Sequence, residues 1–92
     1  MLELKFTAKF KKDYKRAQKQ GKDLKKLEKI LEKLVCREEL PKSACDHSLG
    51  GVYRGHRECH IEPDWFLIYR IDEEGLILIA TRTGSHSELL GL

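Results

Sequence analysis

The residues with the clearest chemical potential in this chain gather around one proline. The stretch His60-Ile61-Glu62-Pro63-Asp64-Trp65 holds an imidazole, two carboxylates and an indole. An imidazole titrates near neutral pH, and a carboxylate beside it can orient the ring or act as a base. Because Pro63 suits the first corner of a tight turn, His60 and Asp64 on either side of it can reach one bound group. Three further candidates stand at loop-like or strand-end positions: His47, Arg82 and His86.

Each candidate also has a purely structural interpretation. Trp65 belongs in a core or, alternatively, stacks on a nucleobase, a contact worth ~1–3 kcal/mol. Arg82 ends an apolar segment, where its planar guanidinium either reaches solvent or binds a phosphate. A single surface histidine is unremarkable. Taken together, His60, Asp64 and the remaining candidates favour a functional site over a polar hairpin turn.

A metal or cofactor site is not expected. His56 and His60 are four residues apart, which on a strand separates their side chains by ~13 Å. Cys59 points to the opposite face of that strand. The chain has no phosphate-binding glycine loop, no serine nucleophile elbow and no Cys-x-x-Cys pair. We therefore expect no metal ligand, no small-molecule cofactor and no metal-dependent chemistry.

Hydrophobic periodicity predicts the elements that must position these residues. Residues 1–6 alternate like a half-buried strand, and Thr7 and Asp23 are helix caps. Helical spacing follows at 8–19 and from 24 to before Leu40, because Pro41 prevents continuation. Period-two sequence begins at Val52, and two segments that are apolar on both faces predict central strands. These segments are 65–71 and 76–82, with at most one helical turn at 86–90.

The predicted order is β-α-α-β-β-β within a single α+β domain spanning residues 1–92. The last three strands form an antiparallel meander, and the two helices form an αα-hairpin packed on one face of the sheet. A two-helix coiled coil is the competing arrangement for the helices. The strand-like sequence downstream favours packing on a sheet.

Charge is distributed unevenly along the chain. Residues 1–35 carry twelve Lys and Arg against five Asp and Glu, whereas residues 36–92 carry six against ten. A basic segment attracts a polyanion such as a phosphate backbone or an acidic protein, although a solvated lysine-rich helix face is the simpler explanation. The three cysteines and the lack of a signal-like or membrane-spanning apolar run predict a cytoplasmic protein without membrane contact.

Three segments resemble the RelE-type toxins of bacterial type II toxin–antitoxin modules, in particular the YafQ branch. They are 46–51 (DHSLGG), 55–69 (GHRECHIEPDWFLIY) and 82–89 (RTGSHSEL). The similarity extends over the whole chain. The His-x-x-Pro-Asp turn combined with Arg-x-Gly-Ser-His is its most specific part, since either piece alone is a weak signal.

The resemblance implies a RelE-like microbial RNase fold and an mRNA interferase that cuts mRNA on the ribosome without metal, inhibiting translation. In that family the ribose 2′-OH attacks the adjacent phosphate, a requirement that selects RNA. By position, His47, His60, Asp64 and His86 would form the acid–base set, and Arg82 and Trp65 would bind substrate. Which group is base and which is acid stays open, with Asp64 or His60 preferred as base and His86 as acid.

The resemblance also implies a cognate acidic antitoxin as partner. One departure is Leu90, where the family often has an aromatic residue. The alternative function is a non-catalytic module on the same fold, acting as an antitoxin-bound repressor subunit. The two alternatives separate on geometry, because the enzyme requires His47, His60, Asp64, Arg82 and His86 to line one concave, accessible patch.

Overall fold

The two long helices begin at the predicted caps. In the computed structural model, which describes residues 1–91, α1 spans Ala8–Lys19 and α2 spans Leu24–Val35. The Thr7 hydroxyl accepts a hydrogen bond from the Phe10 amide at 3.0 Å, and Asp23 accepts one from the Lys25 amide at 3.2 Å. The second helix ends at Val35, before the limit set by Pro41, because the chain turns through a left-handed conformation at Arg37, with φ of 56°.

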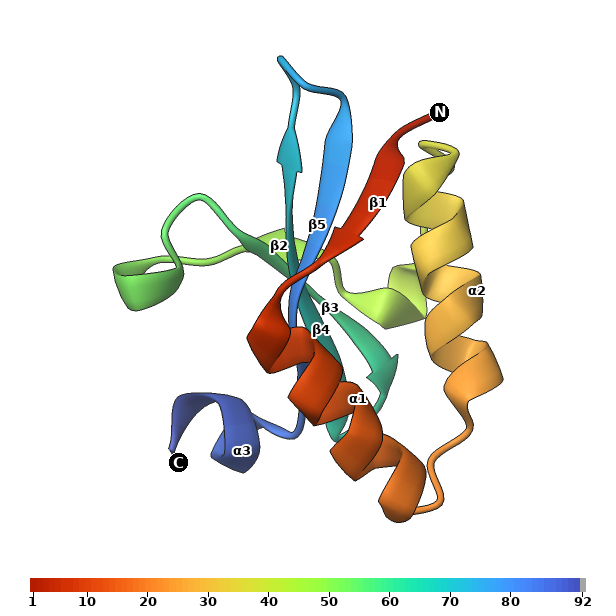
Figure 1. Cartoon of the computed structure of the whole chain (residues 1–92), viewed down its shortest axis with the longest axis vertical. Helices are drawn as coiled ribbons and strands as arrows, with labels where there is room; N and C mark the ends of the chain where they lie inside the picture. Colours follow the sequence, from red (N-terminus) through yellow and green to blue (C-terminus); the bar gives the residue numbers. More distant parts are fainter. Residues whose placement is uncertain (92) are drawn as a thin grey trace.

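The sheet has five strands in the order β1-β5-β4-β3-β2 (Figure 1). The strands are β1 (Glu3–Phe6), β2 (His47–Ser48), β3 (Arg57–Glu62), β4 (Trp65–Asp72) and β5 (Ile77–Gly84). The first strand pairs with β5 in parallel, and all other pairs are antiparallel. The α+β class, the meander and the interior positions of β4 and β5 are therefore as predicted. The short strand β2 and the C-terminal helix α3 (His86–Leu90) complete the fold.

The segment after Val52 differs from the prediction. Strand β3 starts only at Arg57, and a single 3-10 turn, η2, occupies Gly51–Tyr53. The reason is local, because Gly51 and Gly55 both adopt positive φ values, of 62° and 89°, which break an extended strand. A second 3-10 turn, η1 (Lys42–Ala44), connects α2 to β2.

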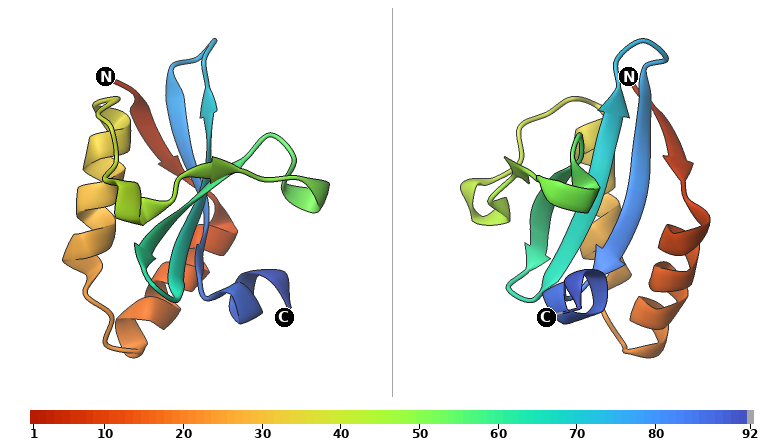
Figure 2. Two further views of the ribbon diagram at one scale, coloured as in Figure 1. Left: turned by 180° about the vertical axis from the view of Figure 1, so that it is seen from behind. Right: turned by 90° about the vertical axis from the view of Figure 1, so that its left-hand side faces the viewer.

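Strand β4 divides the molecule into two layers. Its residues Trp65, Leu67 and Tyr69 face α1 and α2 and form the main core together with Leu27 and Leu78. The alternate residues of β4 face the other side, where α3 and the segment around η2 lie (Figure 2). Both helices of the hairpin thus cover one face of the sheet, as predicted. Within residues 1–91, no helix is long and apolar enough to cross a membrane.

Candidate active site

A row of cross-strand neighbours runs over the sheet on the face away from α1 and α2. His47 of β2 pairs with Glu58 of β3, Glu58 pairs with Ile68 of β4, and Ile68 pairs with Arg82 of β5. Directly opposed residues in antiparallel strands project to the same face. This open face therefore receives side chains from four consecutive strands, although those strands are far apart in the sequence.

A bulge in β5 is what turns Arg82 toward the open face. Ala80 pairs with Tyr69 on the core side, and Arg82 pairs with Ile68, so Thr81 is an extra residue opposite β4. Without it, simple alternation would place Arg82 on the same side as Ala80, which is fully buried. The insertion of one residue thus moves the guanidinium out of the core layer, a common use of a bulge near a functional site.

The next row carries the other two histidines. His60 pairs with Phe66, and their rings meet edge to face with centroids 4.5 Å apart. His86, the first residue of α3, stacks flat on Phe66 with a centroid distance of 3.7 Å and an interplanar angle of 3°. Phe66 thereby separates and orients two imidazoles. Leu89 packs against the same cluster from α3, and Leu49 and Tyr53 pack against it from the segment around η2, so both segments border the open face.

Glu58 lies at the centre of this arrangement. Its side chain is only 3% exposed, and both carboxylate oxygens lie within hydrogen-bond distance of Nε2 of His86, at 3.0 and 3.2 Å. Nε2 of His47 approaches the same carboxylate at 3.6 Å. A buried carboxylate needs partners, and two imidazoles supply them. Glu58 thus fixes the position of the His86 ring, from which an imidazole can take part in proton transfer.

The loop before β2 fixes the ring of His47 through a hydrogen bond from Nδ1. Nδ1 of His47 lies 2.6 Å from the carbonyl oxygen of Cys45, and because a carbonyl only accepts, this nitrogen carries a proton. Nε2 is therefore the nitrogen that faces Glu58. Asp46 anchors the loop, since it accepts hydrogen bonds from the Tyr69 hydroxyl at 2.8 and 2.9 Å and from Nε of Arg57 at 3.1 Å. Burial and the Asp46 carboxylate raise the pKa of Tyr69, so its hydroxyl stays a donor.

Arg82 is held at the edge of the sheet by an acid from α1. Its Nε and Nη2 donate to the two oxygens of Asp13 at 2.7 and 3.0 Å. These hydrogen bonds raise the pKa of Arg82, and the Tyr53 hydroxyl contributes in the same direction. The guanidinium is therefore permanently charged and is fixed between the helix and the open face. Its side chain is 16% exposed, which leaves limited access for an anion.

Trp65 does not occupy the position expected of a base-stacking residue. It is 0% exposed, it belongs to the core layer, and its indole N–H donates to the Thr83 hydroxyl at 2.9 Å. The prediction of Trp65 as a substrate-binding residue is therefore wrong as far as direct stacking is concerned. The reason is the alternation of β4, which turns Trp65 and its neighbour Phe66 to opposite faces.

Asp64 lies in the exposed turn between β3 and β4. This turn is at the same end of the sheet as the start of α3 in both views of Figure 2. Within residues 1–91, no hydrogen bond or ion pair connects the Asp64 side chain to the histidines. The structure thus brings His47, His60 and His86 together around Glu58 and Phe66, places Arg82 in the same cross-strand row, and leaves Asp64 at the rim.

Two members of this cluster were missed by reasoning from the sequence. Glu58 lies two residues before His60 on a strand, a spacing that puts both on one face, so the signal was present. Phe66 gave no such signal, because it stands in a continuous apolar segment. Over the described part of the chain, no three His, Cys, Asp or Glu side chains form a group arranged to hold a metal ion.

Comparison with known proteins adds a family to this geometry. Residues 2–91 match the model of a family described as the bacterial toxin of the type II toxin–antitoxin system, YafQ. The chain is 41% identical over 91 residues to the mRNA interferase toxin YafQ of Escherichia coli K12, covering 97% of this chain and 96% of that protein.

Solved structures agree with the sequence match. The crystal structure of a metal-bound toxin from Helicobacter pylori is similar at a TM-score of 0.93 and 41% identity, covering 98% of this chain and all of that one. The E. coli DinJ–YafQ toxin–antitoxin complex contains a chain similar at a TM-score of 0.88 and 37% identity, with 98% of each chain covered.

Proposed function

The chain belongs to the YafQ family of bacterial type II toxins, and we propose that it is an endoribonuclease that cleaves mRNA on the ribosome and so inhibits translation. The observation that carries the proposal is Glu58, buried between His47 and His86 on a face that also presents Arg82. Acid–base groups and a fixed positive charge are what cleavage of a phosphodiester requires. The name of the E. coli relative, an mRNA interferase, supports RNA as the substrate.

The proposed reaction uses the substrate's own nucleophile. A base, Asp64 or His60, removes the proton of the ribose 2′-OH, and the oxygen attacks the adjacent phosphorus. The bond from phosphorus to the 5′ oxygen breaks, and His86 gives its proton to that oxygen. The products are a 2′,3′-cyclic phosphate and a free 5′ hydroxyl. DNA lacks the 2′-OH, so the same site would leave DNA intact.

The surrounding residues would support each step. Glu58 lies within hydrogen-bond distance of Nε2 of His86 and would hold that ring in position for its role as the acid. Phe66 fixes the plane of that ring by stacking. Arg82 would neutralise the charge that grows on the phosphate oxygens as the 2′ oxygen adds. None of these steps requires a metal ion or a cofactor.

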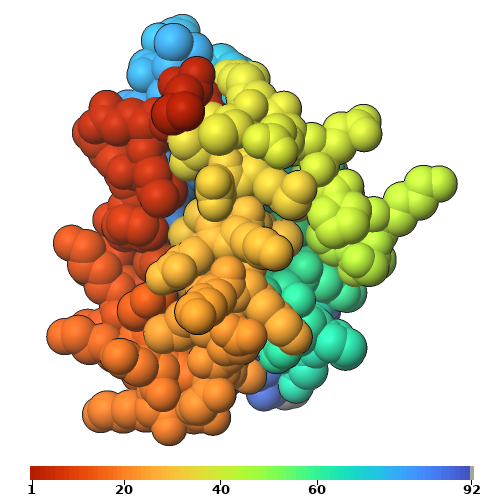
Figure 3. All heavy atoms as spheres, turned by 90° about the vertical axis from the view of Figure 1, so that its right-hand side faces the viewer, coloured from red at the N-terminus to blue at the C-terminus, as the bar shows by residue number. Residues whose placement is uncertain are grey.

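We further propose that the partner of the chain is a cognate antitoxin that docks away from the open face. A groove with a volume of about 650 Å³ runs between β1, α1 and α2. The atoms of β1 and α1 lie beside those of α2 on this side of the molecule (Figure 3). Phe6 is 42% exposed there and stacks on Phe10, and lysines line the α1 wall.

The occupant that we propose for this groove is an amphipathic helix whose acidic residues face the α1 wall, because the α2 wall carries Glu28 and Glu32. Its apolar face would cover Phe6 and Phe10, and its carboxylates would pair with Lys11 and Lys15. The DinJ–YafQ complex shows that a relative of this chain does bind an antitoxin. The basic N-terminal third of the chain is consistent with an acidic partner.

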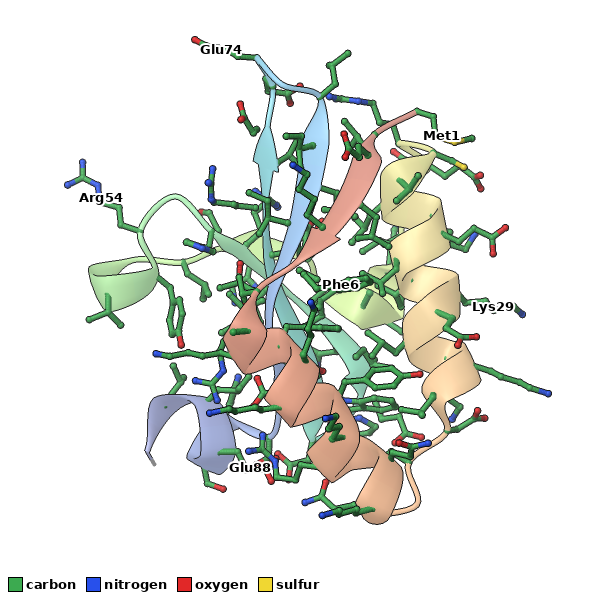
Figure 4. The ribbon with its side chains drawn as sticks, viewed as in Figure 1. Met1, Phe6, Lys29, Arg54, Glu74 and Glu88 are labelled. Carbon is green, nitrogen blue, oxygen red and sulfur yellow. The ribbon has the colours of Figure 1, made fainter. Side chains whose placement is uncertain are left out.

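Cleavage of a translated message is the direct test of the enzyme proposal. Purified chain added to a translation mixture should cut the mRNA and leave cyclic phosphate ends, also with a chelator that removes transition metals but spares magnesium. Arg82→Ala should reduce the rate, whereas Arg54→Ala should not, because Arg54 extends into solvent away from the sheet (Figure 4). Intact mRNA with a correctly folded chain would contradict the proposal and favour the repressor module.

The antitoxin proposal needs its own pair of variants. Phe6→Ser should weaken binding of the antitoxin at least tenfold, because it removes the exposed ring of the groove. Val52→Ser is the matched control, since Val52 is also an exposed apolar side chain, 93% accessible, but lies in η2 outside the groove. Equal affinities of the two variants, measured by calorimetry, would place the antitoxin elsewhere.

A further inference from the structure

The acid that holds Arg82 comes from an unexpected part of the chain. Asp13 is the only acidic residue of α1, a helix otherwise rich in lysine, and it is 3% exposed. It follows Phe10 by three residues and precedes Ala17 by four, so it stands in the stripe that faces the sheet. A carboxylate in such a position is costly unless it is fully hydrogen-bonded.

Asp13 obtains that bonding from residues near the open face. Besides the two hydrogen bonds from Arg82, it accepts one from the Thr83 backbone amide at 3.1 Å and one from Nη2 of Arg16 at 3.1 Å. The Thr83 amide is available because β1 ends opposite Ala80, so this end of β5 has no outer strand. Asp13 thus takes the place of a strand neighbour and clamps Arg82 at the same time.

Asp13 uses only two of the three nitrogens of the guanidinium. Asp13 engages Nε and Nη2, the side of the fork nearest the chain, so Nη1 makes no contact with it. A bidentate pair of this kind fixes the plane of the guanidinium as well as its position. An arginine that is already oriented loses little freedom when it binds a phosphate.

We propose that Asp13 is a positioning residue for RNA cleavage, acting through Arg82. The proposal rests on the function proposed above. Asp13 does not touch the substrate; it holds the guanidinium at the edge of β5 so that Nη1 meets the scissile phosphate. The same helix reaches α3 through an ion pair, because Nε of Arg16 lies 3.0 Å from the Glu88 carboxylate. One helix therefore braces the elements that carry Arg82 and His86.

A double-mutant cycle separates positioning from mere structural support. Asp13→Asn and Arg82→Lys should each lower kcat by roughly 10²-fold, the loss expected from a small misplacement at a reacting centre. If Asp13 acts through Arg82, the double variant should be no slower than the slower single variant. If the kcat losses of the two single variants multiplied in the double variant, the proposal would be overturned. Full activity of Asp13→Asn would also overturn it.

A variant with no link to Arg82 serves as the control for a general loss of stability. Leu27→Ala creates a cavity in the core under α2 and should lower the melting temperature as much as Asp13→Asn or more, yet leave kcat unchanged for the folded protein. Should Asp13→Asn fail to fold, Asp13→Glu keeps the charge and shifts it by one methylene. That variant should fold and still lose roughly 10²-fold in kcat; an unchanged kcat would overturn the proposal.

A readout independent of cleavage keeps this test apart from the function on which it rests. The Arg82 Nε proton should exchange slowly with water in the wild-type chain and at least tenfold faster in Asp13→Asn, as followed by nuclear magnetic resonance. Unchanged exchange would show that Asp13 does not restrain Arg82. If the wild-type chain cleaved no RNA but exchange were still faster in Asp13→Asn, the proposed enzymatic function would be refuted. The restraint of Arg82 by Asp13 would stand.

Discussion

The two faces of β4 contrast although their residues alternate along one strand. The side facing α1 and α2 carries Trp65, Leu67 and Tyr69, and the polar atoms of Trp65 and Tyr69 are satisfied inside the protein. The open side carries Phe66 and Ile68, over which titratable rings lie with partial access to solvent. One face therefore supplies stability, and the other supplies the rigid platform on which the proposed active site is built.

The contrast shows that residue type alone does not identify the face that carries the candidate site. An indole and a phenol, both capable of recognition, serve the core, whereas a phenylalanine with no polar atom orients two histidines. The β4 side chains are buried on both faces, and the difference is the accessibility of the side chains that lie over them. The side chains of His47 and His86 are 51% and 40% exposed, and Trp65 is 0% exposed. Substitutions on the two faces should therefore affect different observables.

The largest effect should follow from His86→Ala on the open face. Loss of the proposed acid should lower the cleavage rate by roughly 10²–10⁴-fold. The chain should still fold, at a lower melting temperature, because buried Glu58 loses its His86 partner. Primer extension on a translated message measures the rate, and expression in a bacterial host should no longer arrest growth. A His86→Ala chain as toxic as the wild type would remove His86 from the acid–base set.

Trp65→Ala on the core face should have the opposite profile. Removing a fully buried indole should cost about 3–5 kcal/mol of unfolding free energy, measured by urea denaturation. The fraction that remains folded should cleave at a rate close to that of the wild type. A strongly reduced cleavage rate in folded Trp65→Ala would contradict the assignment of stability to one face and cleavage to the other.

Tyr69→Phe probes the buried hydroxyl that connects the core face to Asp46 in the loop of His47. Removing the hydroxyl deprives Asp46 of a buried donor and should cost about 1.5–3 kcal/mol, with faster amide exchange at residues 45–48. Tyr14→Phe is the matched control, because the Tyr14 hydroxyl makes no hydrogen bond within residues 1–91. Equal free energies of unfolding for the two variants would show that the Tyr69 hydroxyl does not stabilise the loop through Asp46.

The smallest effect concerns the start of α3, and it depends on pH. The Ser85 backbone amide, at 2.8 Å, lowers the pKa of Glu88 below its ordinary value of 4.5. A lowered pKa in the folded state stabilises the protein above the ordinary value and loses that contribution as the pH falls through the folded value. Glu88→Gln should therefore cost about 0.3–1 kcal/mol at neutral pH and almost nothing in strong acid. A pH-independent difference in thermal melts would contradict this linkage.

The sequence predicted those parts of the fold that local physics determines. Helix α1 has the predicted bounds, because a cap at Thr7 and a clear apolar spacing agree. The strand predicted from Val52 was wrong, since glycines with positive φ interrupt the alternation. The short strand β2 could not be foreseen, because two residues carry no periodicity and the pairing of His47 with Glu58 is a long-range contact.

The site was predictable as a set of residue types but not as a geometry. His60 and His86 lie on the open face together, yet nothing in a continuous apolar segment reveals that Phe66 joins them or that Trp65 points away. The orientation of Arg82 depends on the bulge at Thr81, and no pattern in the sequence predicts that bulge. Asp13 did carry a signal, as the only acid within the apolar stripe of a basic helix.

The parallel pairing of β1 with β5 has a consequence for the synthesis of this protein. The backbone of Glu3–Phe6 pairs with Ile77–Ala80, and the Thr7 hydroxyl donates to the Thr81 carbonyl at 2.6 Å across 74 positions of sequence. A nascent chain cannot close these contacts until its last strand has left the ribosome, and such distant pairings form late. A chain whose β5 has not yet been synthesised therefore cannot assemble the open face.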